Sequence, residues 1–358
     1  MENLQKFFKN KKILITGHTG FKGSWLTQIL LNWGAKISGI ALKPNTKPSL
    51  FETLRIEKKI RNNFCDIRDF RRISEIIKRE KPEIVFHLAA QALVRDSYDD
   101  PLYTFDTNII GTANILQAIK EVGTVKAVVM ITTDKVYENK ESGLPFKEND
   151  KLGGYDPYSA SKAAAEIVIG SYINSFFNPE NYKHSHSTLL ASARSGNILG
   201  GGDWCKDRIA TDIIRAIFEK NEEIIIRSPQ AIRPWLHVLE PLYGYLLLAK
   251  KLYSEKKEFV GSWNFGPKES NYLTVEQLTK TAIKILDRGS YKIKPDSKKH
   301  EATLLKLNNN KAKKLLGWQP KLKINKILQN TFSWYKSFYN KEDIIKLTNN
   351  QITSFFNK

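Results

Sequence analysis

A tyrosine and a lysine four residues apart are the pair in this 358-residue sequence best suited to acid–base chemistry. They are Tyr158 and Lys162 in the segment YSASK. Residues four apart lie on the same face of a helix, so the two side chains would point in one direction. A phenol ordinarily has a pKa of about 10. A neighbouring ammonium group favours the phenolate, which would make Tyr158 a usable base at neutral pH.

A second set of polar residues follows an apolar run upstream, in MITTDKVYEN. Thr133 could hydrogen-bond a reacting hydroxyl and orient it toward Tyr158. Asp134 and Lys135 come next, and a simple oxidoreductase or epimerase built on Tyr, Lys and Thr has no need of them. The extra pair indicates a second chemical step, such as elimination of water. The alternative interpretation is an aspartate that caps the strand beside an exposed lysine.

Three spaced glycines near the N-terminus, Gly17, Gly20 and Gly23 in TGHTGFKG, indicate a dinucleotide site. Glycines permit a tight turn and let backbone amides approach a pyrophosphate, which then lies at a helix N-terminus. A glycine triplet alone is often only a turn, but this one stands between the first predicted strand and the first predicted helix. We therefore expect a nucleotide cofactor to bind here.

The choice of cofactor depends on how the second predicted strand ends. An acid there would bind the adenosine ribose of NAD, but the segment reads IALKPN, with Lys43 just beyond the strand. Lys43 could tolerate the 2′-phosphate of NADP or be an exposed loop lysine. Asp66, in CDIRD, could accept a hydrogen bond from the adenine amino group. The residues alone leave NAD and NADP open.

Apolar runs that alternate with helical stretches surround these motifs and predict βαβ units with a parallel sheet. This is the pattern of an α/β, Rossmann-type doubly wound fold, whose ligands bind at the carboxyl ends of the strands. His87 ends one such strand and is expected to be packed there rather than catalytic. The predicted strands cover 11–17, 35–42, 83–90 and 126–132, and the predicted helices cover 21–34, 69–81, 104–121 and 156–176.

The pattern becomes irregular after about residue 180, where loops rich in Gly, Asp and Pro begin. We expect a dinucleotide-binding Rossmann domain over 1–180, a smaller C-terminal substrate-binding region mainly over 181–340, and a weakly amphipathic tail over 341–358. No Pro- or Ser-rich linker separates them, so later segments are expected to interleave with the first domain. Further helices are predicted at 207–219, 238–252, 274–287 and 323–338.

The composition, 41% hydrophobic and 26% charged, is that of an ordinary soluble globular protein. No segment resembles a signal peptide or offers the roughly 20 apolar residues that span a bilayer. We therefore expect a cytoplasmic protein that has no membrane partner. Cys65 and Cys205 lie far apart and lack metal-ligand spacing, which favours free thiols and no metal site.

A net charge of +20 would suit a nucleic-acid partner. The lysines, however, are spread through the predicted helices and are not gathered with aromatic residues on one segment, which favours a solvated basic surface. A non-catalytic Rossmann module that binds nucleic acid stays an alternative. The intact glycine turn and the Tyr158–Lys162 pair argue against it, so nucleic acid is not the expected partner.

Together the motifs resemble the extended short-chain dehydrogenase/reductase family over roughly residues 11–338. Three segments, TDK, GGYDPYS and IRPWLHVLEPL, are similar to its CDP-glucose 4,6-dehydratase subgroup in particular. The related dTDP-glucose dehydratases carry Thr-Asp-Glu at the strand end, and 4-epimerases lack both acid/base residues. The full set of similar segments is GHTGFKGSWL, PSLFE, DIRDF, HLAAQALVRDSY, TDKVYEN, GGYDPYSASK, NSFFNPENY, GGGDWCKDR, IRPWLHVLEPL, WNFGP and LGW.

The resemblance implies conversion of CDP-glucose to CDP-4-dehydro-6-deoxyglucose and water, with one NAD regenerated in each turnover. Tyr158, assisted by Lys162, would remove the 4-hydroxyl proton while hydride leaves C4, and the hydride would later return to C6. Asp134 would be the acid on the 6-hydroxyl. Lys135 would be either a neutral base at C5 or a cation that stabilises the enolate. NAD is favoured because a recycled hydride needs no reducing pool, and loose binding is expected from the missing acid after the second strand.

The resemblance also assigns binding residues. Arginine suits a diphosphate because its planar fork binds two oxygens at once. The family further implies a homodimer and a part in surface-polysaccharide biosynthesis. A dehydratase or 4-epimerase of another nucleotide sugar stays open, because the sequence does not determine the base. The implied cofactor contacts are Gly17, Gly20, Phe21, Gly23, Asp66, Ala89, Tyr158 and Lys162, and the implied substrate contacts are Asn108, Asn197, Arg208 and Arg233.

Overall fold

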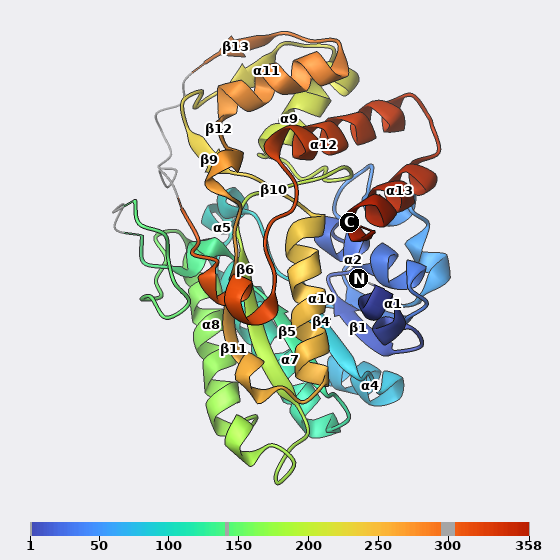
Figure 1. Cartoon of the computed structure of the whole chain (residues 1–358), viewed down its shortest axis with the longest axis vertical. Helices are drawn as coiled ribbons and strands as arrows, with labels where there is room; N and C mark the ends of the chain where they lie inside the picture. Colours follow the sequence, from blue (N-terminus) through green and yellow to red (C-terminus); the bar gives the residue numbers. More distant parts are fainter. Residues whose placement is uncertain (1, 140–142, 295–304, 358) are drawn as a thin grey trace.

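A seven-stranded parallel sheet forms the centre of the protein in a computed structural model that describes residues 2–139, 143–294 and 305–357 (Figure 1). The strand order is β11-β6-β5-β4-β1-β2-β3, and every neighbouring pair is parallel. The order reverses between β1 and β4, so the predicted Rossmann-type doubly wound fold is confirmed. The strands are β1 (Lys12–Thr16), β2 (Lys36–Ala41), β3 (Arg61–Phe64), β4 (Ile84–His87), β5 (Ala127–Ile131), β6 (Leu189–Ser195) and β11 (Gly261–Phe265).

Helices cover both faces of the sheet, because the side chains of a strand point alternately to either side. In β1, Ile13 and Ile15 join one buried cluster with α2 and α10, whereas Leu14 joins a second cluster with α4, α7 and α8. A sheet buried on both faces requires strands that are apolar throughout, as β5 is. The helices are α2 (Phe21–Asn32), α4 (Phe70–Glu80), α7 (Gly111–Val122), α8 (Pro157–Ser175) and α10 (Leu239–Tyr253).

The C-terminal half builds a smaller layer above the carboxyl ends of the strands (Figure 1). Its short strands pair as β7 with β10, β9 with β12 and β8 with β13. Both β6 and β11 follow residue 180, so the chain returns to the main sheet after that point. This layer contains β7 (Ile198–Leu199), β8 (Ile224–Ile226), β9 (Ile232–Pro234), β10 (Leu236–His237), β12 (Tyr272–Thr274), β13 (Tyr291–Ile293), α9 (Ile209–Ile214), α11 (Val275–Leu286) and α12 (Ile324–Tyr339).

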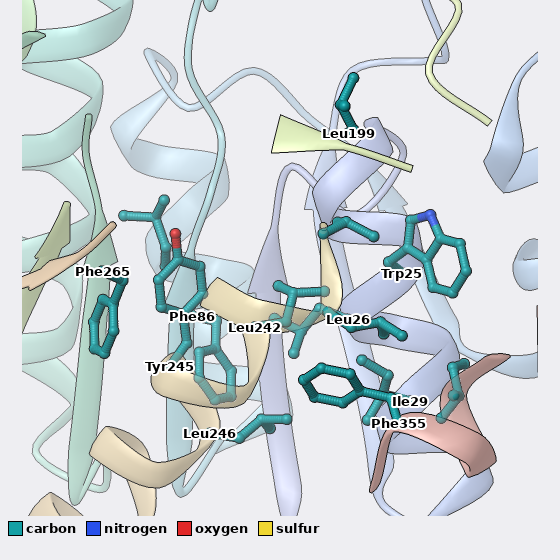
Figure 2. Packing of buried hydrophobic residues seen from close by; sticks show 14 of the residues in the cluster. Trp25, Leu26, Ile29, Phe86, Leu199, Leu242, Tyr245, Leu246, Phe265 and Phe355 are labelled. Atoms are coloured by element: carbon teal, nitrogen blue, oxygen red, sulfur yellow. The ribbon is translucent and has the colours of Figure 1, made fainter. Parts of the chain in front are cut away.

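The C-terminal tail is a helix, α13 (Ile344–Phe356), that packs on α2. Trp334 Nε1 donates to Thr348 Oγ1 at 2.9 Å, which ties α13 to α12. Figure 2 shows Phe355 of α13 beside Leu26 and Ile29 of α2 and near Leu246 of α10. The tail therefore covers the face of the sheet that carries α2 and α10.

One helix predicted as continuous, 104–121, is interrupted. The chain forms α6 (Pro101–Phe105), then a π-helical turn over Asp106–Ile110, and only then α7. Helix 207–219 is likewise α9 followed by a π-helical turn over Arg215–Lys220. Among the described residues, no helix is long and apolar enough to cross a membrane. Elements that the sequence pattern did not predict include β3, β6, β11, α1 (Glu2–Phe8) and α5 (Val94–Asp99).

Candidate active site

A cavity of about 1080 Å³ lies where the carboxyl ends of the strands meet the smaller layer. The point at which the strand order reverses, between β1 and β4, lies at its wall. Ligands of doubly wound folds bind at this point. The cavity is lined by all but one of the predicted site residues, namely Gly17, Gly20, Phe21, Gly23, Asp66, Ala89, Thr133, Asp134, Lys135, Tyr158, Lys162, Asn197, Arg208 and Arg233.

The glycine turn at one end of the cavity is packed too tightly for side chains. Gly17 has a φ of +72°, and a Cβ there would lie 2.7 Å from the backbone nitrogen of Ala89. A Cβ on Gly23 would collide with the carbonyl oxygen of Gly17. Gly20 is the N-cap of α2 and makes no side-chain hydrogen bond to the first amides of this helix. These amides and the positive end of the helix dipole suit a pyrophosphate group.

The far end of the cofactor region is bounded by Asp66 and by the end of β2. Arg68 donates two hydrogen bonds to the Asp66 carboxylate, from its backbone nitrogen to Oδ1 at 2.9 Å and from Nη2 to Oδ2 at 2.8 Å. Although burial opposes the change, these bonds lower the pKa of Asp66. His18, which the sequence analysis did not single out, lies buried beside β2 with Nε2 2.7 Å from Asn62 Oδ1. A Cβ on Gly39 would contact its ring at 2.5 Å, so this strand needs glycine there.

Helix α8 carries Tyr158 and Lys162 into the cavity, and its cap explains where it begins. Asp156 accepts a hydrogen bond from the Ser159 backbone nitrogen at 2.9 Å, and Pro157 is the first helical residue. Burial raises the pKa of Tyr158 to about 12, while a hydrogen bond with Thr133 opposes it. Burial lowers the pKa of Lys162 to about 8. The phenol of the protein by itself is therefore protonated at neutral pH.

The turn after β5 places an acid beside the tyrosine. Thr133 Oγ1 donates to Asp134 Oδ1 at 3.0 Å. The Asp134 side chain is buried, which raises its pKa, although the charge of Lys135 opposes the rise. A Cβ on Gly196 would collide with Asp134 Oδ2, so glycine at 196 makes room for the carboxyl group. A buried carboxyl of this kind can hold a proton and donate it.

Lys22 is a cavity residue that the sequence analysis missed. It belongs to the glycine turn, yet its Nζ donates to Ser195 Oγ at the end of β6, at 3.2 Å. Burial, with the charge of Arg208, lowers its pKa to about 8, and Asp134 opposes the change. Lys22 therefore connects the glycine turn to the end of β6 within the cavity. The available signal was a lysine between two glycines of the turn.

The two predicted substrate arginines both reach the cavity from the smaller layer. Arg208 Nη1 donates to Asp203 Oδ2 at 2.6 Å. The charge of Arg208 opposes the raised pKa of Tyr158, so this arginine acts electrostatically on the predicted catalytic tyrosine. Arg233 lies on β9, where its backbone pairs with Leu273 of β12. Asn197 lines the same wall and accepts a backbone hydrogen bond from Leu236 at 3.0 Å.

Asn108 does not belong to the cavity wall. It lies in the π-helical turn and is 1% exposed. Its Nδ2 donates to Ser161 Oγ at 2.8 Å and to the Gln91 carbonyl at 3.0 Å, and its Oδ1 accepts from the Gln91 backbone nitrogen at 2.9 Å. The amide is thus engaged by the protein and supports α8 from behind. His87 is similarly enclosed, with Nδ1 2.8 Å from Thr16 Oγ1, and burial lowers its pKa to about 3.

Comparisons with known proteins agree with the fold and the cavity described above. A family described as GDP-mannose 4,6 dehydratase matches residues 14–331. CDP-glucose 4,6-dehydratase of Salmonella typhimurium is 46% identical over 352 residues, which cover 98% of each chain. UDP-glucose 4-epimerase of Mycoplasma pneumoniae is 26% identical over 348 residues, 92% of this chain and 98% of that protein.

Among solved structures, dTDP-glucose 4,6-dehydratase from Streptomyces venezuelae, with NAD and TYD bound, has a TM-score of 0.77. It is 21% identical and covers 93% of this chain and 99% of its own. UDP-glucose-4-epimerase from Stenotrophomonas maltophila, with bound NAD and formylated UDP-arabinopyranose, has a TM-score of 0.80 at 20% identity, over 93% of this chain and 100% of its own. At these identities the likeness shows a shared fold.

Proposed function

The chain belongs to the GDP-mannose 4,6 dehydratase family, and we propose that it is a CDP-glucose 4,6-dehydratase that uses NAD. It converts CDP-glucose to CDP-4-dehydro-6-deoxyglucose and water. The observation that carries the proposal is the buried carboxyl of Asp134, hydrogen-bonded to Thr133 in the cavity that also holds Tyr158 and Lys162. Epimerisation needs no such acid. The choice of CDP-glucose rests on the 46% identical relative of that name.

NAD, when bound, would supply the acceptor for the C4 hydride and, once reduced, the hydride for C6. The chain fits this cofactor through its glycine turn, where the amides at the start of α2 lie open to a pyrophosphate. Phe21 and Ala89 flank the turn, and Asp66 stands near the end of β3 for the adenine. Because β2 ends at Ala41 and is followed by Leu42 and Lys43 rather than by an acid, we expect binding to be loose and activity to depend on added NAD.

Oxidation at C4 begins with Tyr158 as the base for the 4-hydroxyl proton. Thr133, whose hydroxyl lies between Tyr158 and Asp134, orients the sugar hydroxyl. Arg208 is the cation that opposes the raised pKa of Tyr158, and Lys162, one helical turn along α8, would add a second positive charge that favours the phenolate. Lys162 is fixed by a hydrogen bond from Nζ to the Ile131 carbonyl at 3.2 Å. The base therefore acts within a positively charged end of the cavity.

Elimination needs an acid for the 6-hydroxyl and a group that handles the C5 proton. Asp134 is the acid, because burial favours its protonated form. Lys135, next in the chain and also in the cavity wall, is the group at C5. It acts either as a neutral base or as a cation on the enolate. Exchange of the C5 hydrogen with deuterated solvent separates the two: a Lys135→Met variant loses exchange if Lys135 is the base and retains it if Lys135 only holds charge.

Arg208 and Arg233 bind the diphosphate from the smaller layer, which lines the cavity together with the glycine turn. Their planar forks match phosphate oxygens. Asn197 lies between β6 and β7 at the same wall. This layer would therefore select the nucleotide, while the sheet end carries out the chemistry.

The protein would act as a homodimer in the cytoplasm. The helical segment 101–110 and α8 contact each other and expose large apolar side chains: Leu102 is 78% exposed, Ile110 50% and Ile167 63%. Such a surface suits a second copy of the same helix pair. The two cysteines, Cys65 and Cys205, are free thiols, which fits a reducing compartment.

The test is to incubate the purified protein with NAD and, separately, with CDP-, dTDP-, UDP- and GDP-hexoses. Mass spectrometry then reports the loss of one water. Loss from CDP-glucose alone supports both reaction and nucleotide. Loss from another nucleotide sugar keeps the mechanism and overturns the nucleotide. A changed sugar without loss of water would indicate an epimerase, and no reaction at all would contradict the proposal.

A further inference from the structure

A buried ion pair lies behind the catalytic residues, between α8 and β6. Arg194 Nη2 donates to Glu166 Oε2 at 2.7 Å, and Nε donates to Oε1 at 3.0 Å, so the pair is bidentate. The two side chains are 3% and 2% exposed. Replacing a buried pair with apolar residues of similar size often leaves stability unchanged or improves it. Stability is thus a weak reason for this pair, and its neighbours suggest another.

Glu166 joins the catalytic helix to the strand end that carries Thr133. It lies on α8 one turn after Lys162. Its Oε1 accepts a hydrogen bond from Thr132 Oγ1 at 2.5 Å, and Thr132 directly precedes Thr133. Its Oε2 accepts from Ser192 Oγ of β6 at 2.8 Å. A single carboxylate therefore fixes α8 against the ends of β5 and β6.

Arg194 holds the other side of the catalytic turn. Its Nη1 donates to Tyr137 Oη at 2.7 Å, and Tyr137 directly follows the turn that contains Asp134 and Lys135. Tyr137 Oη in turn donates to Asn264 Oδ1 of β11 at 2.8 Å. The turn is therefore clamped on both flanks, by Thr132 through Glu166 and by Tyr137 through Arg194.

Glu166 also supplies negative charge close to Lys162. The charge of Glu166 raises the pKa of Lys162 against the lowering by burial. Other titratable groups near Lys162 are Tyr158 on the same helix, His87 on β4 and Lys22 on α2, and the charge of Lys162 lowers the pKa of both His87 and Lys22. His87 and Lys22 supply no negative charge, so Glu166 is the group in this set whose charge favours the protonated form of Lys162.

We propose that Glu166 and Arg194 form a positioning pair that sets the Thr133–Lys135 turn against α8 and keeps Lys162 positively charged. The meaning of a charged Lys162 rests on the proposed function, in which it supports Tyr158. The placement of the pair and the charge state of Lys162 can be measured without any substrate. Failure of the pair and failure of the proposed function are therefore distinguishable.

The experiment follows the titration of Lys162 by NMR in the full-length protein labelled with ¹³C at lysine Cε, the signal being assigned by its loss in Lys162→Met. The variants are Glu166→Gln, the double variant Glu166→Gln/Arg194→Met, and the conservative Arg194→Lys. Glu166→Gln leaves a buried arginine unpaired and is prone to unfold, so the double variant removes both charges. Ser262→Ala is the matched control, because Ser262 Oγ accepts from Arg194 Nη2 at 2.8 Å and its loss leaves both charges in place.

We expect the titration midpoint of Lys162 to fall by about one pH unit in Glu166→Gln, and by less in the double variant. Arg194→Lys and Ser262→Ala should keep the wild-type midpoint. With CDP-glucose, the double variant should lose at least tenfold in kcat with little change in KM, and the alkaline limb of its pH profile should move to lower pH. A folded double variant with the wild-type midpoint, or an equal shift in Ser262→Ala, would overturn the proposal whether or not CDP-glucose is turned over.

Discussion

Replacing Asp134 with asparagine should separate the two halves of the proposed reaction. Asparagine keeps the shape of the side chain and an oxygen for the hydrogen bond from Thr133 Oγ1, which is 3.0 Å in the wild type. Glycine at 196 leaves the same room for the amide. What is lost is the ability to hold and donate a proton, which burial favours in the carboxyl by raising its pKa. General acid catalysis contributes about 10²–10⁴ in rate, so elimination should slow by that factor, or about 3–5 kcal/mol of barrier.

Oxidation at C4 should survive in this variant. Burial favours the neutral form of Asp134, so the neutral amide of asparagine leaves the electrostatic surroundings of Tyr158 close to those in the wild type. We expect the oxidation rate to stay within about threefold of wild type, under about 1 kcal/mol. Rapid-mixing absorbance at 340 nm follows reduced nicotinamide, and quenched mass spectrometry follows water loss. Reduced cofactor should accumulate and persist. If oxidation falls as much as elimination does, the role assigned to Asp134 is refuted.

Three further predictions follow from the structure. Tyr158→Phe keeps the ring and removes the base, so the 340 nm transient should slow by about 10²–10⁴, while calorimetry should find CDP-glucose binding unchanged. Gly196→Ala places a Cβ against Asp134 Oδ2; elimination should slow at least about tenfold, and chemical unfolding should report a loss of about 1–3 kcal/mol, whereas wild-type elimination would show that the carboxyl does not need its present position. Glu240 lies buried in the first turn of α10, and burial raises its pKa to about 7, above about 4.3 in an unfolded chain, so this carboxyl should cost the wild type stability as pH rises from about 4.5 to 7. Glu240→Gln should abolish that loss and be more stable than wild type by about 1–3 kcal/mol at pH 8 in urea titrations; equal stability of the two proteins at pH 8 would contradict this.

The sequence pattern predicted the strands that are apolar throughout. It missed strands that contain buried polar residues bound to distant partners. The runs that became β1, β2, β4 and β5 are buried on both faces and read directly as strands. The strand β6 ends in ASARS, and its Ser192 and Arg194 are buried because they bind Glu166. The strand β11 carries Asn264 for Tyr137. A hydrophobic pattern cannot reveal a strand whose polar residues are satisfied by partners far away in the sequence.

The site residues likewise fall into those that local sequence motifs predict and those that depend on distant contacts. Thr133, Asp134, Tyr158 and Lys162 lie in short motifs at the ends of predicted elements, so local spacing was enough to predict that they are neighbours. Lys22 was missed because its partner, Ser195, is 173 residues away. Asn108 was expected at the substrate, but a π-helical turn that no periodicity predicts directs its amide to Ser161 and Gln91. Contacts across the sheet end are three-dimensional information that spacing does not contain.

Burial raises the pKa of both Asp134 and Tyr158. This helps Asp134, which has to donate a proton, and hinders Tyr158, which has to accept one, and nearby cations counteract the effect on Tyr158. Asp134 must keep a proton to donate, and burial favours its protonated form by raising its pKa. Tyr158 must lose one, and burial hinders it, raising its pKa to about 12. Arg208 opposes that rise in the protein as it stands, and the positive charge of Lys162 is one helical turn away. Asp134 and Tyr158, which require opposite protonation states, therefore lie in different electrostatic surroundings, as acid and base partners require. Because burial lowers the pKa of Lys162 to about 8, its positive charge is lost as pH rises through that value, and the activity of the enzyme should fall on the alkaline side for that reason.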